Sequence, residues 1–447
     1  MRPRSITGPL ILVIIGVVFL LNNLGHDIPF WTYLTDYWPF LLIGLGVIRL
    51  AEVLLHVSQG SALPAHSGGG GWIFWIALIC ICLAVWGGQN GIHIGRLGAP
   101  GTLGMLGNSF DYSVNTGTNT DGITHLVLDN IDGSLTVHGT DGFDIKVTGH
   151  KTVHAFSQSD ADRADKETAV HLERQVQGDT LVLRADEPTH SGMLSISTDL
   201  DIAVPKGVNV EARGRGDLTI EDMGGTVSVT DSRGDVRLSN IAQDVRVEAA
   251  RGGLVKAEGL KGSLDLQGRG GDVQLDGVAG PVTINGEFSG TLEFRALAKP
   301  IHFESSHSDF RAEGVPGSIT MDLGDLKMDN VTGPVKFRTG TRDIDANDVS
   351  NSLELNVDRG DIDVSASKLP LAKMDLHSHN GDITLTLPDK AGFDLDGKTG
   401  EGEVEDDFGS PLESHNDGRS ATITGKVGTG PQLVVVTDRG TLSIKKK

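Results

Sequence analysis

The hydrophobic positions of the chain follow two different patterns, which divide it into an apolar head and a polar body. Three nearly continuous apolar runs, at 6–24, 38–57 and 72–88, lie within the first 90 residues. A membrane-spanning helix needs about 20 apolar residues, within a range of roughly 17–25. The first two runs reach this length, whereas the third is shorter and ends in Gly87 and Gly88. The pattern predicts an N-terminal α-helical membrane region of three transmembrane helices over residues 1–90.

Basic and aromatic residues around the runs predict their orientation. Arg2 and Arg4 precede the first run, and the loop 25–36 contains no lysine or arginine. Because basic residues favour the cytoplasmic side, we expect a cytoplasmic N-terminus and a C-terminal body outside the cytoplasmic (inner) membrane. Tryptophan and tyrosine stand at the ends of the runs, where interfacial aromatic belts form; these are Trp31, Tyr33, Tyr37, Trp38, Trp72, Trp75 and Trp86.

Two alternatives to this multi-pass topology remain open. A third run that is interfacial or re-entrant would leave the body in the cytoplasm. A cleaved signal peptide followed by buried helices is the other reading, but two further apolar runs and the lack of a small-residue cleavage site disfavour it.

A few charged and sulfur-bearing residues lie inside the runs. Arg49 and Glu52 are three positions apart, so they share one helix face and can form an ion pair. Charges inside a membrane are functional candidates in general, but long side chains near the interface can reach water. We therefore interpret this pair as structural. Cys80 and Cys82 are expected to pack as small apolar side chains.

Between residues 210 and 365 the apolar positions recur in units of about nine residues. The second and fourth residues after each turn are usually apolar and the one between them is polar, as in Leu218-Thr219-Ile220. This alternation is typical of a half-buried strand. A further apolar position precedes every other turn and so recurs at twice this spacing, at Met223, Ile241, Leu260, Val278, Leu297, Val315, Val331 and Val349.

The double spacing predicts an all-β parallel β-solenoid with about 18 residues per coil. Each coil would then hold two strands that face each other across a thin core. A series of nine-residue antiparallel hairpins is the rival, although it would not explain the longer repeat.

The rest of the chain is assigned around this regular core. Residues 91–119 are expected to be a linker, and the solenoid domain to span 120–447, with less regular coils at 101–205. The glycine-free segment 158–175 could form a short helix at that end. Residues 388–430 are expected to be irregular, and the strand pattern at 433–444 is expected to close the domain. The 60 glycines among 447 residues mark the corners, where tight turns and close backbone approach are needed.

Composition narrows the function. The chain has 38 lysines and arginines against 59 aspartates and glutamates, a formal charge of −21. Residues 1–95 hold three of each sign, so the body carries the whole imbalance. This charge argues against nucleic acid as a partner, because phosphate binding needs a basic footprint. The two cysteines, both in the third run, exclude a disulfide scaffold and a thiolate zinc site.

Three kinds of candidate site stand out in the body, and each has a simpler explanation. Arg-Gly-Asp triplets at 215–217, 233–235 and 359–361 invite a receptor-binding interpretation, but all three fall at the same corner of the repeat. Asp217, Asp235 and Asp272 could stack as carboxylates for glycoside chemistry, yet repetition alone also stacks them. His377 with His379, and His150 with His154, have metal-ligand spacing without a third ligand nearby in sequence. We therefore assign no catalytic, cofactor-binding or metal-binding residues and no cofactor.

Two stretches resemble known bacterial families. Segments 8–24 (GPLILVIIGVVFLLNNL) and 38–46 (WPFLLIGLG) resemble the LiaI/LiaF-like transmembrane region of envelope proteins. Segments 202–210 (IAVPKGVNV), 216–220 (GDLTI) and 437–444 (TDRGTLSI) resemble the adhesin-like β-solenoid family. The resemblance implies an envelope location, with adhesion or envelope-stress sensing, and it supplies no catalytic residues.

The sequence therefore supports three hypotheses of decreasing strength. The first is a membrane-anchored adhesin-like or scaffolding protein, with the lipid bilayer and an envelope protein or polysaccharide as partners. The second is an envelope-stress regulator of LiaF type that acts on a sensor kinase or transporter. The third is a polysaccharide-active enzyme, which we disfavour because Tyr112 is the sole tyrosine or tryptophan after residue 86 to offer a sugar platform. The sequence leaves the oligomeric state open.

Overall fold

The computed structural model describes residues 108–119, 122–175, 178–186 and 195–447. The chain divides into two compact units, 1–99 and 100–447, and all described residues belong to the second. The three apolar runs, the Arg49–Glu52 pair and the two cysteines lie outside the described residues. Among the residues that are described, no helix combines the length and the hydropathy that a bilayer crossing requires.

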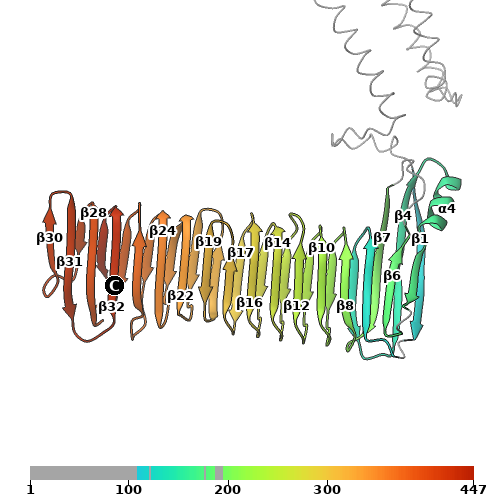
Figure 1. Cartoon of the computed structure of the whole chain (residues 1–447), viewed down its shortest axis with the longest axis horizontal. Helices are drawn as coiled ribbons and strands as arrows, with labels where there is room; N and C mark the ends of the chain where they lie inside the picture. The colour runs from blue at the N-terminus through green and yellow to red at the C-terminus, as the bar shows by residue number, and fades with distance from the viewer. Residues whose placement is uncertain (1–107, 120–121, 176–177, 187–194) are drawn as a thin grey trace, which may run out of the picture. The chain divides into compact units, whose positions relative to one another are not determined.

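The second unit is built from two long sheets that face each other (Figure 1). Sheet A contains 16 strands, which succeed one another along the unit in the following order. They are β1 (Asn108–Asn119), β4 (Asp144–Ala155), β7 (Ile196–Pro205), β3 (Leu135–Thr140), β9 (Leu218–Glu221), β11 (Val236–Ser239), β13 (Val255–Glu258), β15 (Val273–Asp276), β17 (Leu292–Leu297), β20 (Val315–Met321), β21 (Asp325–Asp329), β23 (Asp343–Asn347), β25 (Ile362–Ser365), β27 (Ile383–Leu387), β33 (Leu442–Lys446) and β29 (Val404–Asp406).

Sheet B runs opposite to it, and its neighbouring strands are likewise hydrogen-bonded in order. They are β5 (Val170–Arg174), β6 (Thr180–Ala185), β2 (His125–Ile131), β8 (Asn209–Gly214), β10 (Val227–Ser232), β12 (Val245–Ala249), β14 (Leu264–Gly270), β16 (Val282–Phe288), β18 (Ile301–Glu304), β19 (Ser308–Ala312), β22 (Val335–Thr341), β24 (Ser352–Arg359), β26 (Lys373–Ser378), β32 (Gln432–Arg439), β28 (Phe393–Glu401), β31 (Ser420–Val427) and β30 (Glu413–Asp417).

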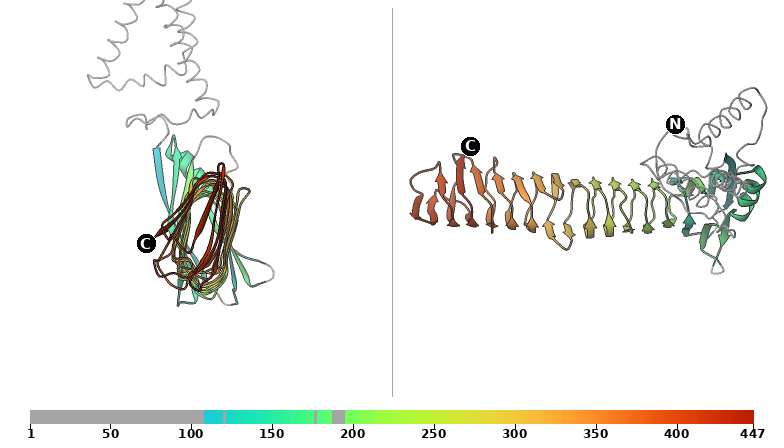
Figure 2. Two further views of the ribbon diagram at one scale, coloured as in Figure 1. Left: turned by 90° about the vertical axis from the view of Figure 1, so that its left-hand side faces the viewer. Right: turned by 90° about the horizontal axis from the view of Figure 1, so that it is seen from above.

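The register of the parallel strands gives the length of one coil. Val227 is paired with Val245, Val245 with Leu264, and Leu264 with Val282. Each pairing therefore advances the chain by one coil of about 18 residues. Each coil contributes one strand to each sheet, and the coils superpose when viewed along the stack (Figure 2). The predicted coil length and the two strands per coil are confirmed in this region.

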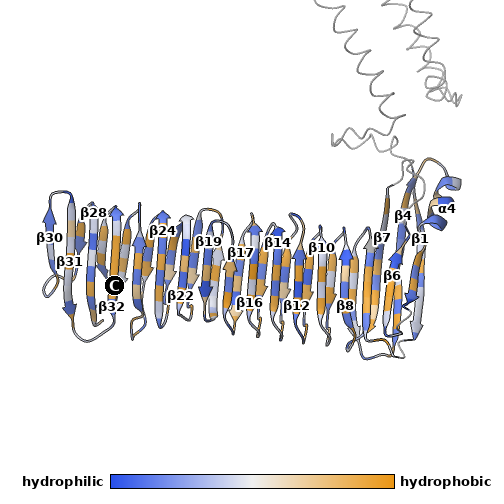
Figure 3. Cartoon of the chain, in the orientation of Figure 1, coloured by the Kyte–Doolittle hydropathy of each residue, from blue (hydrophilic) through white to orange (hydrophobic). Residues whose placement is uncertain are grey.

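The core is the thin space between the sheets, filled by stacked aliphatic side chains. Strands such as β14 and β15 bury every second residue, so Leu264, Leu266, Val273 and Leu275 point inward. Figure 3 shows the corresponding alternation of apolar and polar residues along the strands. Because parallel pairing places equivalent residues of successive coils side by side, each inward position forms a continuous apolar column.

The parallel prediction is wrong over residues 301–341, where the winding runs backward for one layer. β18 and β19 form an antiparallel hairpin within sheet B, and β20 and β21 form another within sheet A. β19 is antiparallel to β22 and β20 to β17, so one layer runs backward between two forward halves. A strand with its turn has about the same length whether the turn crosses to the other sheet or doubles back, so the sequence period could not distinguish them.

Both ends of the stack are more structured than expected, and the parallel prediction is also wrong there. Antiparallel pairs join β1 to β4, β4 to β7 and β5 to β6 at one end, and β28 to β31 and β30 to β31 at the other. β1 lies inside the segment 91–119 that was expected to be a linker. Helix α4 (Gln158–Glu167) is shorter than the predicted segment 158–175, and β5 follows it at Val170. The segment 388–430, expected to be irregular, contains β28 to β31. The C-terminal strands β32 and β33 insert between this outer layer and the coil of β26 and β27.

Candidate functional site

The three Arg-Gly-Asp triplets occupy equivalent corners, where each aspartate binds the backbone of the next coil. Oδ1 of Asp217 accepts a hydrogen bond from the amide of Asp235 at 2.9 Å, and Oδ1 of Asp235 accepts one from the amide of Leu254 at 2.9 Å. Asp361 accepts from the amide of Asp382 at 2.8 Å. These carboxylates satisfy amides that the turn leaves without a strand partner.

The glycine of the triplet is required because successive corners lie almost in contact. A Cβ on Gly234 would lie 2.4 Å from the carbonyl oxygen of Gly216, and one on Gly216 would lie 1.7 Å from that of Gly133. Only glycine permits this approach of one backbone to the next. The arginines are half-exposed, and Arg233 lies 3.7 Å from Asp231. The geometry gives the triplet a structural role in the corner.

The aspartates that could have formed a carboxylate stack are held in the same way. Asp272 accepts a hydrogen bond from the amide of Thr291 at 2.7 Å, as Asp217 and Asp235 do in their coils. A general acid or base must be free to exchange its proton with a substrate. The structure instead commits one oxygen of each to the backbone.

A second corner ladder, at the opposite edge of the stack, uses the same chemistry in two coils, at Asp244 and Asp348. Asp244 accepts hydrogen bonds from the amide of Ser263 at 2.8 Å and from its hydroxyl at 2.7 Å. These two bonds hold the pKa of the Asp244 carboxyl below its ordinary value. Part of the acidic surplus of the body is therefore structural.

Three of the four histidines singled out by their spacing lie beside different acids, and the fourth, His154, lies on β4. His377 lies 2.9 Å from Asp375, and His379 lies 2.6 Å from Asp438. His150 lies 3.5 Å from Asp199. Within the described parts of the chain, no three histidine, cysteine or acidic side chains gather as a metal site would require.

The outer faces of the two sheets carry charged side chains in compensated pairs. On sheet B, Arg246 lies 2.9 Å from Glu248 and 3.2 Å from Asp265 of the next coil. On sheet A, Lys256 lies 2.6 Å from Glu258. Such exposed pairs contribute little to stability, about 0–1 kcal/mol each. Their main effect is an outer face on which basic side chains lie beside acidic ones.

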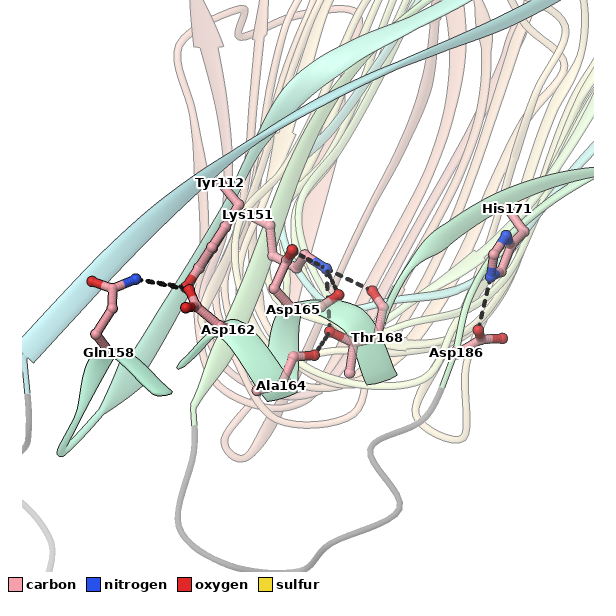
Figure 4. A network of polar contacts seen from close by, with 9 residues as sticks. All are labelled: Tyr112, Lys151, Gln158, Asp162, Ala164, Asp165, Thr168, His171 and Asp186. Carbon is pink, nitrogen blue, oxygen red and sulfur yellow. Dashed lines mark hydrogen bonds and ion pairs between the residues drawn. The ribbon is translucent and has the colours of Figure 1, made fainter. Parts of the chain in front are cut away.

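Helix α4 is fastened to sheet A by a buried lysine that the sequence did not single out (Figure 4). Lys151 on β4 is 2% exposed. Its Nζ donates to the carbonyl oxygens of Asp165 and Thr168, both at 2.8 Å, and lies 2.7 Å from the Asp165 carboxylate. A buried ammonium needs such partners to offset the loss of water. Its position, opposite a charged helix, is visible only once β4 and α4 are in contact.

A tyrosine and an aspartate complete this contact. The hydroxyl of Tyr112 on β1 donates to Asp162 on α4 at 2.7 Å, and Gln158 donates to both residues. Partial burial and the hydrogen bond to Asp162 raise the pKa of Tyr112 to about 12. Tyr112 therefore stays protonated and acts as a donor that positions the helix.

A small cavity of about 10 Å³ lies at the corner near Gly133, Gly216 and Leu218. A space of this size holds at most one water molecule. The repeated outer faces of the two sheets offer a larger candidate surface than this cavity does.

The sequence matches two family models. Residues 123–445 match Toastrack DUF4097, and residues 7–113 match the LiaF transmembrane domain. The second match includes all three apolar runs, so it extends beyond the segments that carried the resemblance. No curated protein matches the chain.

Three solved bacterial structures are similar to this chain over most of its length, at low identity. A putative cell adhesion protein from Clostridium sporogenes is 13% identical, with 76% of this chain and 100% of that chain covered, at a TM-score of 0.18. A putative adhesin from Bacteroides fragilis is 11% identical, with 75% and 97% covered, at a TM-score of 0.26. One from Parabacteroides distasonis is 10% identical, with 74% and 97% covered, at 0.19.

Proposed function

The chain belongs to the Toastrack DUF4097 family, and from this premise we propose that it is a membrane-anchored envelope protein whose β-solenoid serves as a binding surface. The match to the LiaF transmembrane domain supports an anchor in the bilayer. Three spans that begin with a cytoplasmic N-terminus would carry the solenoid outside the cytoplasmic membrane, as Arg2 and Arg4 favour.

One observation carries the proposal of a binding surface: the outward side chains form columns in fixed register. On sheet A, Thr219, Arg237, Lys256, Gln274 and Glu293 lie side by side on five successive strands. Neighbouring strands are about 4.8 Å apart, so the column presents evenly spaced polar groups along the unit. Such a surface suits an extended partner, an envelope polysaccharide or an envelope protein segment.

We propose that this surface binds without catalysis. The aspartates that line up along the corners accept backbone amide hydrogen bonds, and the exposed arginines and lysines lie beside acidic neighbours. Groups held in this way can contact a partner at each coil, but they are not free to act as a catalytic acid, base or nucleophile.

A photo-reactive residue in native membranes tests the binding surface. It is placed at Gln274 on sheet A or, as the matched position on the other sheet, at Thr283, whose side chains are both outward. The proposal expects adducts with envelope polysaccharide or protein from one face and few from the other. The absence of adducts from both faces would contradict it.

The match to the LiaF transmembrane domain favours a second function, that of an envelope-stress regulator acting on a sensor kinase or transporter. The same experiment with the photo-reactive group in the apolar head, for instance at Asn22, distinguishes the two. Adducts of the head with a kinase or transporter, and no adducts from either face of the solenoid, would support the regulator function.

A further inference from the structure

Each sheet of the described unit ends in strands that pair on one side only among the described residues. These are β1 and β29 in sheet A, and β5 and β30 in sheet B. An open sheet edge pairs with other chains unless it is short, charged or covered. Three of these edges are short and charged: β29 is VED, β30 is ESHND and β5 is VHLER.

β1 lacks these protective features. It has 12 residues, NSFDYSVNTGTN, without proline or lysine, and Asp111 is its single formal charge. Exposed and half-buried residues alternate along the strand from Ser109 onward. It is therefore a long, regular strand with an open hydrogen-bonding edge.

β1 itself carries little charge to repel a second copy. Asp111 is its single formal charge, and the other three end strands each carry at least two charged residues. Like charges oppose association, so a pair of β1 strands adds little repulsion of its own.

We propose that β1 pairs antiparallel with β1 of a second copy of this chain, which joins sheet A of the two copies into one sheet across a two-fold axis. Since Asp111 is the sole charge on the strand, every register except the one centred on Asp111 places it opposite an uncharged residue. An interface of this kind is self-complementary, as a two-fold dimer requires.

The choice of a second copy rests on the proposed membrane anchor. The LiaF transmembrane match ends at residue 113, inside β1, and β1 begins a short stretch of chain after Gly88. Copies anchored in one membrane therefore each carry β1 a short stretch of chain from the anchor. Confinement to a common surface raises the effective concentration of one edge for the other.

Single cysteines in the full-length protein locate the pairing. Cys80→Ser and Cys82→Ser remove the native thiols, and cysteine is then placed at Ser109, Ser113 or Asn115, or at Gln274 as the control. In a two-fold antiparallel pair, a step of two residues away from the axis moves the two copies of that residue about 14 Å further apart. A disulfide needs Cα atoms within about 7 Å. The proposal therefore expects membrane-embedded protein to cross-link at one or two adjacent exposed positions of β1, about tenfold above Gln274.

A charge variant tests the same contact without a cross-link. Ser113→Lys with Asn115→Lys should abolish the dimer in detergent-solubilised full-length protein, because two lysines per strand block an open edge. The matched pair Thr219→Lys with Gln274→Lys, on the outer face of the central coils, should leave the dimer intact. The melting temperature should change little in either variant.

Three outcomes would overturn the pairing: no dimer at any β1 position, equal cross-linking at Gln274, or cross-linking of β1 to a different protein. Alkaline extraction of the same samples tests the anchor separately. Release of the chain from membranes would contradict the proposed function, whereas the cross-linking pattern along β1 decides the pairing.

Discussion

At the scale of single residues, the corner aspartates explain why a motif that suggests receptor binding recurs in this chain. Asp235 accepts the amide of Leu254 through one oxygen, and its other oxygen lies 2.6 Å from Arg237. We expect Asp235→Ala to lower the free energy of unfolding by about 1–2 kcal/mol, because the Leu254 amide loses its partner. Arg233→Ala, in the same triplet, should change it by less than about 0.5 kcal/mol.

Circular dichroism of the detergent-solubilised chain under chemical denaturation measures this difference. Tryptophan fluorescence would not, because all five tryptophans precede residue 87. Equal losses for Asp235→Ala and Arg233→Ala would argue against the structural role.

The second corner ladder predicts a loss of stability in acid. The pKa of Asp244 is lower in the folded protein than its ordinary value of 3.8. Its ionised form therefore stabilises the fold above about pH 4, and this contribution disappears as the pH falls through the folded pKa. Asp244→Asn keeps an acceptor for Ser263 that does not titrate. Between about pH 5 and about pH 3 the melting temperature of the native chain should fall more than that of Asp244→Asn; identical profiles would contradict the assignment.

Because the inward columns form the core, the stability cost of a substitution depends on whether the residue faces inward or outward. Leu266 is fully buried, whereas Gln274 lies on the outer face between Lys256 and Glu293. Leu266→Asp should cost several kcal/mol, because it places an unpaired charge in the core. Gln274→Asp should be nearly silent. Chemical denaturation of the two variants tests which residues face the core. Comparable losses in the free energy of unfolding would mean that Gln274 also faces the core.

At the scale of elements, the sequence predicted those features of the fold that depend only on the alternation of apolar and polar residues. The strands, their inward residues and the length of one coil follow from period-two alternation within a unit that repeats twice per coil. The reversal at β19 and β20 could not be predicted, because a hairpin and a corner use the same number of residues.

Candidate sites were predicted less well than strands. Spacing located the triplets and the histidines, but their roles depend on partners about one coil away or more, such as Leu254 for Asp235 and Asp438 for His379. The helix contact through Lys151 gave no sequence signal. A lysine on a strand usually faces water, and its burial is set by the packing of α4.

One arginine forms hydrogen bonds with both hairpins of the reversed layer. Arg342 donates from Nε to the carbonyl oxygen of Asp322 at 2.6 Å and from Nη1 to the hydroxyl of Ser308. Arg342→Met keeps the aliphatic stem and removes the donors, so we expect a loss of about 1–3 kcal/mol. Hydrogen exchange should accelerate in β19 and β20 while β14 and β16 stay protected. The exposed Arg338→Met is the matched control, and uniform acceleration or none would contradict the local role.

At the scale of the whole molecule, the chain combines an apolar head without net charge and an acidic body of repeated coils. The head is matched by the LiaF transmembrane domain, and the body belongs to the Toastrack DUF4097 family. Coils stacked in register offer long polar faces, and charged short strands protect most of their edges. A binding surface of this kind reaches envelope partners only if the body lies outside the cytoplasm.

Reporter fusions after Lys447 test that placement directly. Alkaline phosphatase is active only outside the cytoplasm, whereas a cytoplasm-only fluorescent protein fluoresces only inside. If the N-terminus lies inside, as Arg2 and Arg4 favour, and the chain crosses three times before residue 90, as proposed, phosphatase activity without fluorescence is expected. Fluorescence without phosphatase activity would mean that residues 72–88 do not cross the membrane, and it would contradict an extracytoplasmic binding surface.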